Sequence, residues 1–251
     1  MLREKTVFGP IRSRRLGNSL GINLLPENGK ICNFDCIYCE CGWNSDGRED
    51  RTLPGPEDLR SALEKKLSEC RDAGIAIDSI TFSGDGEPTL NPAFPQMVDI
   101  TLELRDRFFP QAAVSVLSNA TTAGRPEIFR ALCKVDNAIM KIDAADNGSV
   151  RLVNRPVAGY DLEQVISSLE AFKGNFILQT MFLRGGGFDS SDTGNLQGWM
   201  SIVRRLHPRR IMVYTIDRPA PMSGLEKFTE EQMRAMVAPL IEEGFDIQIK
   251  G

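Results

Sequence analysis

The chain alternates between two hydrophobic patterns. Short apolar runs rich in β-branched and aromatic residues predict strands, and longer stretches in which apolar residues recur every three or four positions predict amphipathic helices. The predicted strands cover residues 18–25, 79–84, 113–119, 138–143, 176–183 and 211–216, with a possible seventh at 245–249. The predicted helices cover residues 57–73, 92–109, 125–133, 160–173, 195–207 and 229–243.

The regular succession of strand and helix predicts the fold class. Repeated strand–helix–strand units build a parallel sheet with right-handed crossovers. About six units are too few for a closed eight-unit barrel but enough for an open one. We therefore predict an α/β protein with a partial (βα)6 TIM-type barrel. Without an internal repeat or linker, residues 1–251 should form one domain, in which an N-terminal segment with the first strand (1–30) and a cysteine-rich loop (31–43) precede the remaining units.

One helix carries a clear start signal. Thr229 precedes the last predicted helix, and Gln232 follows it by three residues. This is the spacing of a capping box, in which each side chain bonds the backbone N–H of the other residue. We expect Thr229 to be the N-cap.

Composition and charge exclude some classes of function. The 251 residues are 41% hydrophobic and 25% charged, as in an ordinary soluble globular protein. The net charge of −4 argues against a dedicated nucleic-acid binder, although Arg12, Arg14 and Arg15 form a local basic patch. No apolar run reaches the roughly eighteen residues of a membrane span, and the start lacks the apolar core of a signal peptide. We expect a cytoplasmic protein.

Polar residues follow the predicted strands at their carboxyl ends. In a parallel α/β fold these ends share one rim, where ligands and reactive groups gather. In chain order the candidates are the cysteines after the first strand, then Gly84, Asp85, Gly86, Glu87, Ser118, Asn119, Lys141, Asp143, Gln179, Met181, Arg184, Tyr214 and Asp217.

Four of the six cysteines lie within ten residues: Cys32, Cys36, Cys39 and Cys41. Clustered thiols in a cytoplasmic protein more often bind metal or react than form disulfides. The only histidine, His207, excludes most His-containing zinc sites and makes a Ser-His-Asp triad improbable. A structural zinc site completed by Cys41 remains an alternative, although a Cys-x-Cys end suits zinc poorly.

The first three of these cysteines are spaced Cys-x3-Cys-x2-Cys. Three thiolates for a [4Fe–4S] cluster leave one iron open to a small molecule. The spacing closely resembles that of the radical S-adenosylmethionine (radical SAM) superfamily. Tyr38, directly before the third cysteine, matches the aromatic residue usual in that family.

Two further segments resemble the same family. Gly84-Asp85-Gly86-Glu87 matches its Gly-Gly-Glu segment, which contacts the methionine amino group, with Asp85 as a departure in the middle position. Either Glu87 or backbone carbonyls could make this contact. Asn119 resembles the polar residue that usually meets the ribose.

The resemblance implies an activity and its cofactors. A [4Fe–4S] cluster on Cys32, Cys36 and Cys39 would bind S-adenosylmethionine at the open iron. Its one-electron reduction, by a flavodoxin- or ferredoxin-type partner, would release a 5′-deoxyadenosyl radical that abstracts hydrogen from substrate. Asp143 and Gln179 are assigned to the cofactor only by their strand-end positions.

The opening "FGPIRSRRLGNSLGINLLP" resembles a short, single-domain subset of Fe–S oxidoreductases related to the tRNA wybutosine-synthesis enzymes. Those enzymes carry further cysteines for a second cluster, for which this chain offers only Cys41, Cys70 and Cys133. Because the chain is also acidic, we do not carry over the tRNA substrate.

Other functions remain open. A non-catalytic iron–sulfur or zinc protein for electron transfer or partner binding would need Cys41 as its fourth ligand. Within the enzyme class, activation of a glycyl-radical enzyme and modification of RNA or a nucleoside are alternatives. The substrate and the role of Cys41 are not determined by the sequence.

Overall fold

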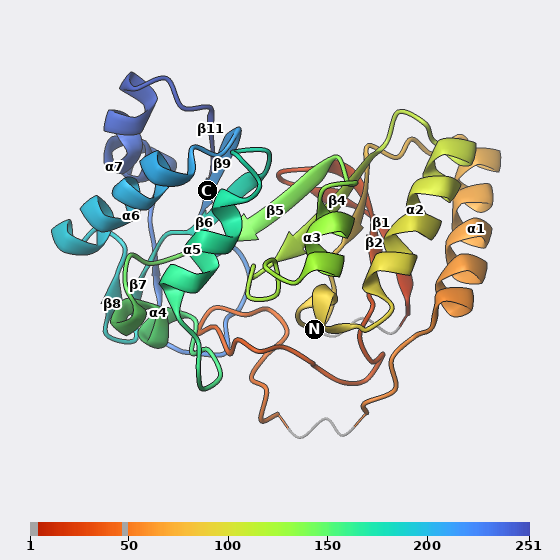
Figure 1. Cartoon of the computed structure of the whole chain (residues 1–251), viewed down its shortest axis with the longest axis horizontal. Helices are drawn as coiled ribbons and strands as arrows, with labels where there is room; N and C mark the ends of the chain where they lie inside the picture. Colours follow the sequence, from red (N-terminus) through yellow and green to blue (C-terminus); the bar gives the residue numbers. More distant parts are fainter. Residues whose placement is uncertain (1–4, 47–49) are drawn as a thin grey trace. The chain divides into compact units, whose positions relative to one another are not determined.

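The computed structural model describes residues 5–46 and 50–251 (Figure 1). Residues 1–4 of the predicted N-terminal segment therefore lie outside the described residues. The helices are α1 (Pro56–Asp72), α2 (Phe94–Phe108), α3 (Pro126–Leu132), α4 (Asn147–Val153), α5 (Leu162–Glu170), α6 (Thr193–Leu206) and α7 (Glu230–Glu242), with a 3-10 turn at Pro88–Leu90. The strands are β1 (Val7–Ser13), β2 (Gly17–Ile22), β3 (Ser79–Phe82), β4 (Ala113–Ser118), β5 (Asn137–Lys141), β6 (Ile177–Met181), β7 (Leu183–Gly185), β8 (Phe188–Asp189), β9 (Arg210–Tyr214), β10 (Glu226–Lys227) and β11 (Ile247–Lys250).

All predicted strands and helices are present, with ends that differ from the prediction by at most three residues. The main sheet has the strand order β1-β2-β3-β4-β5-β6-β9-β11. The pairs β2–β3, β3–β4, β5–β6, β6–β9 and β9–β11 are parallel. Strands that follow each other in chain order and are joined by helices confirm the α/β class and the partial barrel sheet.

The chain divides into two compact units, and the boundary falls within β5. Unit 1 comprises Met1–Cys32, Asn44–Ser118 and Thr122–Ala138, and unit 2 comprises Asn33–Trp43, Asn119–Thr121 and Ile139–Gly251. The single-domain organisation expected from the sequence stays a prediction.

In unit 1, one face of the strands is apolar and the other face is polar. Helix α1 buries the predicted stripe of Leu59, Leu63, Leu67 and Cys70, and it packs against α2 (Figure 1). On β3, Ile80 and Phe82 alternate with Ser79 and Thr81, so the two faces of the strand differ. Buried hydroxyl groups on the second face bond one another in a chain: Ser19 to Thr81 (2.8 Å), Thr81 to Ser79 (3.0 Å) and Ser79 to Ser115 (2.9 Å).

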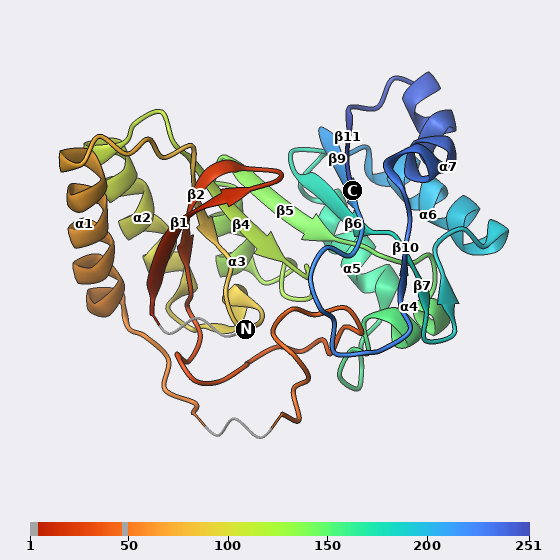
Figure 2. The same cartoon turned by 180° about the vertical axis from the view of Figure 1, so that it is seen from behind.

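The edge strand β1 was not predicted. It pairs with β2 in antiparallel fashion, and the two lie side by side in Figure 2. Its register shifts between Phe8 and Ile11, and it contains Pro10. A proline lacks the ladder N–H and is tolerated mainly at sheet edges, so the segment does not have the pattern of a central strand.

The core of unit 2 contains an aromatic pair, one member of which is also hydrogen-bonded. Trp199 of α6 packs edge-on against Phe182, with ring centroids 5.3 Å apart. Its indole N–H donates to Thr180 Oγ1 at 3.1 Å, and the Thr180 hydroxyl donates to Ile142 O at 2.7 Å. The buried polar atoms of Trp199 and Thr180 are thus satisfied inside the core. A small antiparallel sheet, β10-β7-β8, also belongs to this unit.

None of the helices in the described residues has both the length and the apolar character needed to cross a membrane.

Helix α7 tests the predicted start signal. Thr229 is its N-cap, and the reciprocal bonds with Gln232 are 3.1 Å and 2.8 Å long, which confirms the capping box. We expect Thr229→Ala to lower the free energy of unfolding by about 1 kcal/mol, because a backbone N–H loses its partner. The exposed mid-helix change Ser201→Ala is the control, with an effect within about 0.5 kcal/mol. Urea denaturation followed by circular dichroism measures both, and equal losses would contradict the prediction.

Candidate functional site

The cysteine loop, residues 31–43, is built from short turns. Cys39 N–H donates to Cys36 O at 3.1 Å, and Gly42 N–H donates to Cys39 O at 3.0 Å. Cys36 is buried, whereas Cys32, Cys39 and Cys41 are half-buried. All six cysteines of the chain are described, and none forms a disulfide.

In unit 2 the loop is fastened to the end of α4. Asp35 N–H donates to Asn154 O at 2.9 Å, and Ile37 N–H donates to Val153 O at 3.0 Å. Carbonyl groups at a helix C-terminus have no partner within the helix, so they are available to an adjacent segment. The helix that supports the loop was not predicted from the sequence; its signal is Asp146, which caps it through Gly148 N–H and Ser149 N–H.

Side-chain donors surround the sulfur of Cys36. Asn154 Nδ2 lies 3.4 Å from Cys36 Sγ, and Lys141 Nζ lies 3.7 Å from it. The ammonium group of Lys141 also lies 5.1 Å from the centroid of the Tyr38 ring. These contacts give the buried sulfur of Cys36 polar partners.

Asp143 anchors this group of residues. Its carboxylate accepts hydrogen bonds from Tyr38 OH, from Asn154 Nδ2 (2.7 Å) and from Met181 N–H (2.9 Å). Asp143 is only 2% exposed. The structure therefore brings the predicted residues Tyr38 and Asp143 together, while Gln179, buried on β6, is paired in register with Lys141 of β5.

Burial and charge shift the ionisation of these groups in different directions. Burial raises the pKa of the Cys36 thiol, and the Lys141 charge opposes this. Burial, followed by the charge of Asp143, raises the pKa of Tyr38. Burial alone would lower the pKa of Lys141, but the charges of Cys36 and Asp143 outweigh it and raise that pKa. Lys141 is thus a cation and Tyr38 a neutral hydrogen-bond donor near neutral pH.

In unit 1 the predicted glycine-acid loop extends β3. Gly86 forms a parallel bridge with Ile31, flanked by Ile31 N–H to Asp85 O (3.1 Å) and Glu87 N–H to Ile31 O (3.0 Å). This pairing places the loop beside the residue that precedes Cys32. The Asp85 side chain accepts a hydrogen bond from Asn23 Nδ2 at 3.3 Å, and the backbone N–H of Asp85 donates to Asn23 Oδ1 at 3.1 Å.

The two glycines of this loop have a packing role. A Cβ on Gly84 would lie 2.1 Å from Asn23 Oδ1, and a Cβ on Gly86 would lie 1.9 Å from Ile31 O. Gly86 also has φ +137°, which L side chains rarely adopt. The chain itself thus occupies the space beside each glycine.

Glu87 is buried and serves as a local cap. Its Oε1 accepts from Ser118 Oγ at 2.8 Å, from Thr89 Oγ1 at 2.6 Å and from Thr89 N–H at 3.3 Å. In unit 2, Asn119 Nδ2 donates to Asn33 Oδ1 at 2.6 Å, and Thr121 Oγ1 donates to Asn119 Oδ1 at 2.7 Å. Both predicted residues thus have defined partners within their own units.

Arg184 and the basic patch lie in more exposed settings. Arg184, on β7, is ion-paired with Asp189 (2.6 Å) and Glu226 (3.3 Å), so its charge is compensated. Arg12 and Arg14 are exposed in unit 1, in β1 and in the turn that leads to β2.

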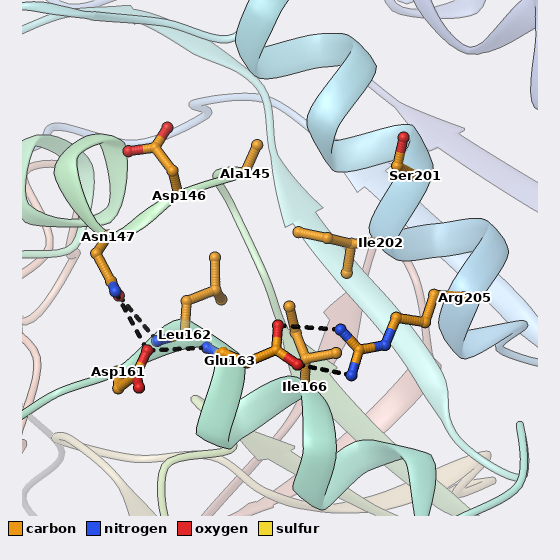
Figure 3. A pocket seen from close by; sticks show the side chains of 10 residues that line it. All are labelled: Ala145, Asp146, Asn147, Asp161, Leu162, Glu163, Ile166, Ser201, Ile202 and Arg205. Atoms are coloured by element: carbon orange, nitrogen blue, oxygen red, sulfur yellow. Dashed lines mark hydrogen bonds and ion pairs between the residues drawn. The ribbon is translucent and has the colours of Figure 1, made fainter.

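A cavity of about 350 Å³ lies in unit 2 near the start of α5 (Figure 3). Its polar groups bond one another: Arg205 pairs with Glu163 (2.7 Å), Asn147 Nδ2 donates to Asp161 Oδ1 (3.2 Å), and Leu162 N–H donates to Asn147 Oδ1 (2.8 Å). Because it contains none of the predicted site residues, we do not place the site there.

The donor set suits an iron–sulfur cluster. Within residues 5–46 and 50–251, no three His, Cys, Asp or Glu side chains gather closely enough to hold a single metal ion. A four-iron cluster does not require its ligands to converge on one metal ion, since each thiolate binds a separate iron. The buried Cys36 sulfur, with N–H donors directed at it, fits such a ligand.

Comparisons with known proteins assign the chain to a family. The family model described as "Radical SAM superfamily" matches residues 29–190. The UPF0026 protein MJ1312 of Methanocaldococcus jannaschii is 31% identical over 217 residues, which cover 84% of this chain and 64% of that protein.

Solved structures share the fold. Streptococcus suis SuiB bound to S-adenosylmethionine superposes with a TM-score of 0.66 at 14% identity, over 92% of this chain and 50% of that chain. Archaeal TYW1 superposes with a TM-score of 0.58 at 13% identity, over 89% of this chain and 71% of that chain. The present chain thus spans less than two thirds of the M. jannaschii relative and half of SuiB.

The packing of Gly86 generates a test. We expect Gly86→Ala to lower the free energy of unfolding by about 3 kcal/mol or more, because the new methyl group meets the Ile31 carbonyl in a strained backbone conformation. Gly74→Ala is the matched control: Gly74 has φ +66° but open space around it, so about 1 kcal/mol is expected. Chemical denaturation measures both, and equal costs would show that the close approach is unimportant.

Proposed function

Because the chain belongs to the radical SAM superfamily, we propose that it is an oxidoreductase that cleaves S-adenosylmethionine reductively and abstracts hydrogen from its substrate. A [4Fe–4S] cluster on Cys32, Cys36 and Cys39 would supply the electron for this cleavage. The observation that carries the proposal is the setting of Cys36: a buried sulfur with two N–H donors, in a loop fastened to α4.

The residues around Cys36 exclude water and hold the loop. Ile37 has no exposed surface and Phe34 is 4% exposed. The Phe34 ring packs edge-on against Tyr160, with centroids 5.4 Å apart. The Tyr38 hydroxyl donates a hydrogen bond to Asp143, which fixes the aromatic ring beside the proposed ligand Cys36. A dry, rigid surround of this kind strengthens electrostatic interactions and limits side reactions.

We assign the methionine amino group to the backbone of residues 84–87 rather than to a carboxylate. The support is that Glu87 Oε1 already accepts three hydrogen bonds within unit 1 and that Asp85 is bonded to Asn23. Gly84 and Gly86 then serve to bring the backbone into position.

The other predicted cofactor residues divide into two roles. Asn119 uses both ends of its amide within unit 2, which favours positioning of the loop over direct contact with the ribose. Asp143 likewise accepts from three donors and is proposed as an anchor. Gln179, buried beside Lys141, remains our proposed direct contact to the cofactor.

The proposed reaction needs a one-electron donor, for which we propose a flavodoxin- or ferredoxin-type protein. We propose a cytoplasmic location, supported by the six unbridged cysteines. The net charge of −4 disfavours nucleic acid as the substrate. A small metabolite, a nucleoside or a glycine residue of a partner enzyme remains possible as the substrate class.

Cofactor cleavage is the direct test. We expect the anaerobically reconstituted protein, given dithionite and S-adenosylmethionine, to form 5′-deoxyadenosine, measured by liquid chromatography. S-adenosylmethionine should also change the electron paramagnetic resonance (EPR) signal of the reduced cluster. Cys36→Ala should lose both the cluster iron and the product.

Cys41→Ala is the matched control. If Cys41 is not a ligand, this variant keeps its iron and its product formation. Loss of its cluster, together with no product from the wild-type protein, would instead support the non-catalytic protein in which Cys41 is the fourth ligand.

A further inference from the structure

The sulfur of Cys36 accepts hydrogen bonds from two side chains of its own unit. Asn154 Nδ2 is 3.4 Å from Cys36 Sγ, and Lys141 Nζ is 3.7 Å from it. Cys36 is the most buried of the three proposed cluster ligands. Side-chain donors at a buried sulfur act on it more strongly than donors in water, because the local dielectric is low.

Asn154 is held in place from several directions. It is 1% exposed and forms the C-cap of α4, where its N–H donates to Val150 O at 2.8 Å. Its carbonyl accepts from Asp35 N–H of the cysteine loop at 2.9 Å. Its amide group has two protons, and the side chain also donates to Asp143 Oδ2 at 2.7 Å. Asp143 thus orients the amide that faces Cys36.

Lys141 adds a positive charge on the same sulfur. It ends β5, and its ammonium group lies 3.7 Å from Cys36 Sγ and over the Tyr38 ring, 5.1 Å from the centroid. The lysine ammonium group offers N–H donors and a positive charge to this sulfur. Lys141 therefore stabilises negative charge at the sulfur.

We propose that Asn154 and Lys141 are positioning residues that raise the reduction potential of an iron–sulfur cluster bound through Cys36. Hydrogen bonds to cluster sulfurs and nearby net charge are known determinants of that potential. Reduction adds one electron from the donor protein, with no bond broken, and part of the new negative charge resides on the thiolate. Both side chains stabilise the reduced form more than the oxidised form.

This inference rests on one part of the proposed function, namely that an iron–sulfur cluster is bound through Cys36. It does not require cleavage of S-adenosylmethionine. Removing either donor should make the cluster harder to reduce, while the chain keeps all three ligand cysteines. A weak physiological donor would then reduce a smaller fraction of the protein, whereas excess dithionite would be less affected.

An EPR-monitored redox titration of the reconstituted protein tests the proposal. We expect Asn154→Leu and Lys141→Met to bind wild-type amounts of iron. At the wild-type midpoint potential, the ratio of reduced to oxidised cluster should fall at least about threefold in each. A tenfold fall corresponds to about 59 mV for a one-electron couple.

Matched variants separate tuning from structural damage. Asn147→Leu replaces the first residue of α4, at its other end, and removes the acceptor of Leu162 N–H; it should leave the potential unchanged. Lys141→Arg keeps the charge and should shift the potential less than Lys141→Met does.

Unchanged potentials in both test variants at full iron content would overturn the proposal, as would an equal shift in Asn147→Leu. If Asn154→Leu binds no iron, the Lys141 variants test the proposal alone. Equal reduction potentials in Lys141→Met and the wild-type protein would then overturn the proposal. The titration needs no S-adenosylmethionine, so a missing 5′-deoxyadenosine product would refute the proposed enzyme function without affecting this test.

Discussion

The hydrogen bonds between the cysteine loop and the end of α4 are the constraint on which the candidate site depends. A loop without regular structure must still satisfy its buried backbone N–H groups, and the last carbonyls of a helix lack partners within the helix. Asp35 and Ile37 donate to Asn154 and Val153, so each segment supplies what the other lacks. The same contact brings the Asn154 side chain against Cys36.

Each unit also buries a carboxylic side chain after a strand and gives it several hydrogen-bond donors. In unit 1, Glu87 accepts from Ser118 and Thr89. In unit 2, Asp143 accepts from three donors, one of them the Tyr38 hydroxyl. A buried polar side chain needs such partners, and one that accepts several hydrogen bonds is a rigid anchor for neighbouring groups. These acids support the loops that are proposed to bind the cofactor.

Much of the fold and part of the site could be predicted from the sequence. The strands and long helices have the periodicity of elements with a buried face, and they are present where predicted. The cysteine spacing indicated the radical SAM superfamily, which the family model over residues 29–190 confirms. In contrast, α4 buries only Val150 and Val153, so it shows no repeated apolar face. Strand β1 contains Pro10 and a register shift, so it lacks the pattern of a regular strand.

By itself, the sequence determined the properties that depend on neighbours along the chain: the periodic elements, the capping box at Thr229 and the spacing of the cysteines that are proposed as ligands. Only the tertiary structure decided the surroundings of those cysteines. Asn154 lies 118 residues after Cys36, and Asp143 lies 105 residues after Tyr38. No local pattern relates residues so far apart, because their proximity results from the packing of separate strands, helices and loops. The chemistry of a metal ligand depends on that proximity, since burial and hydrogen bonds act through space.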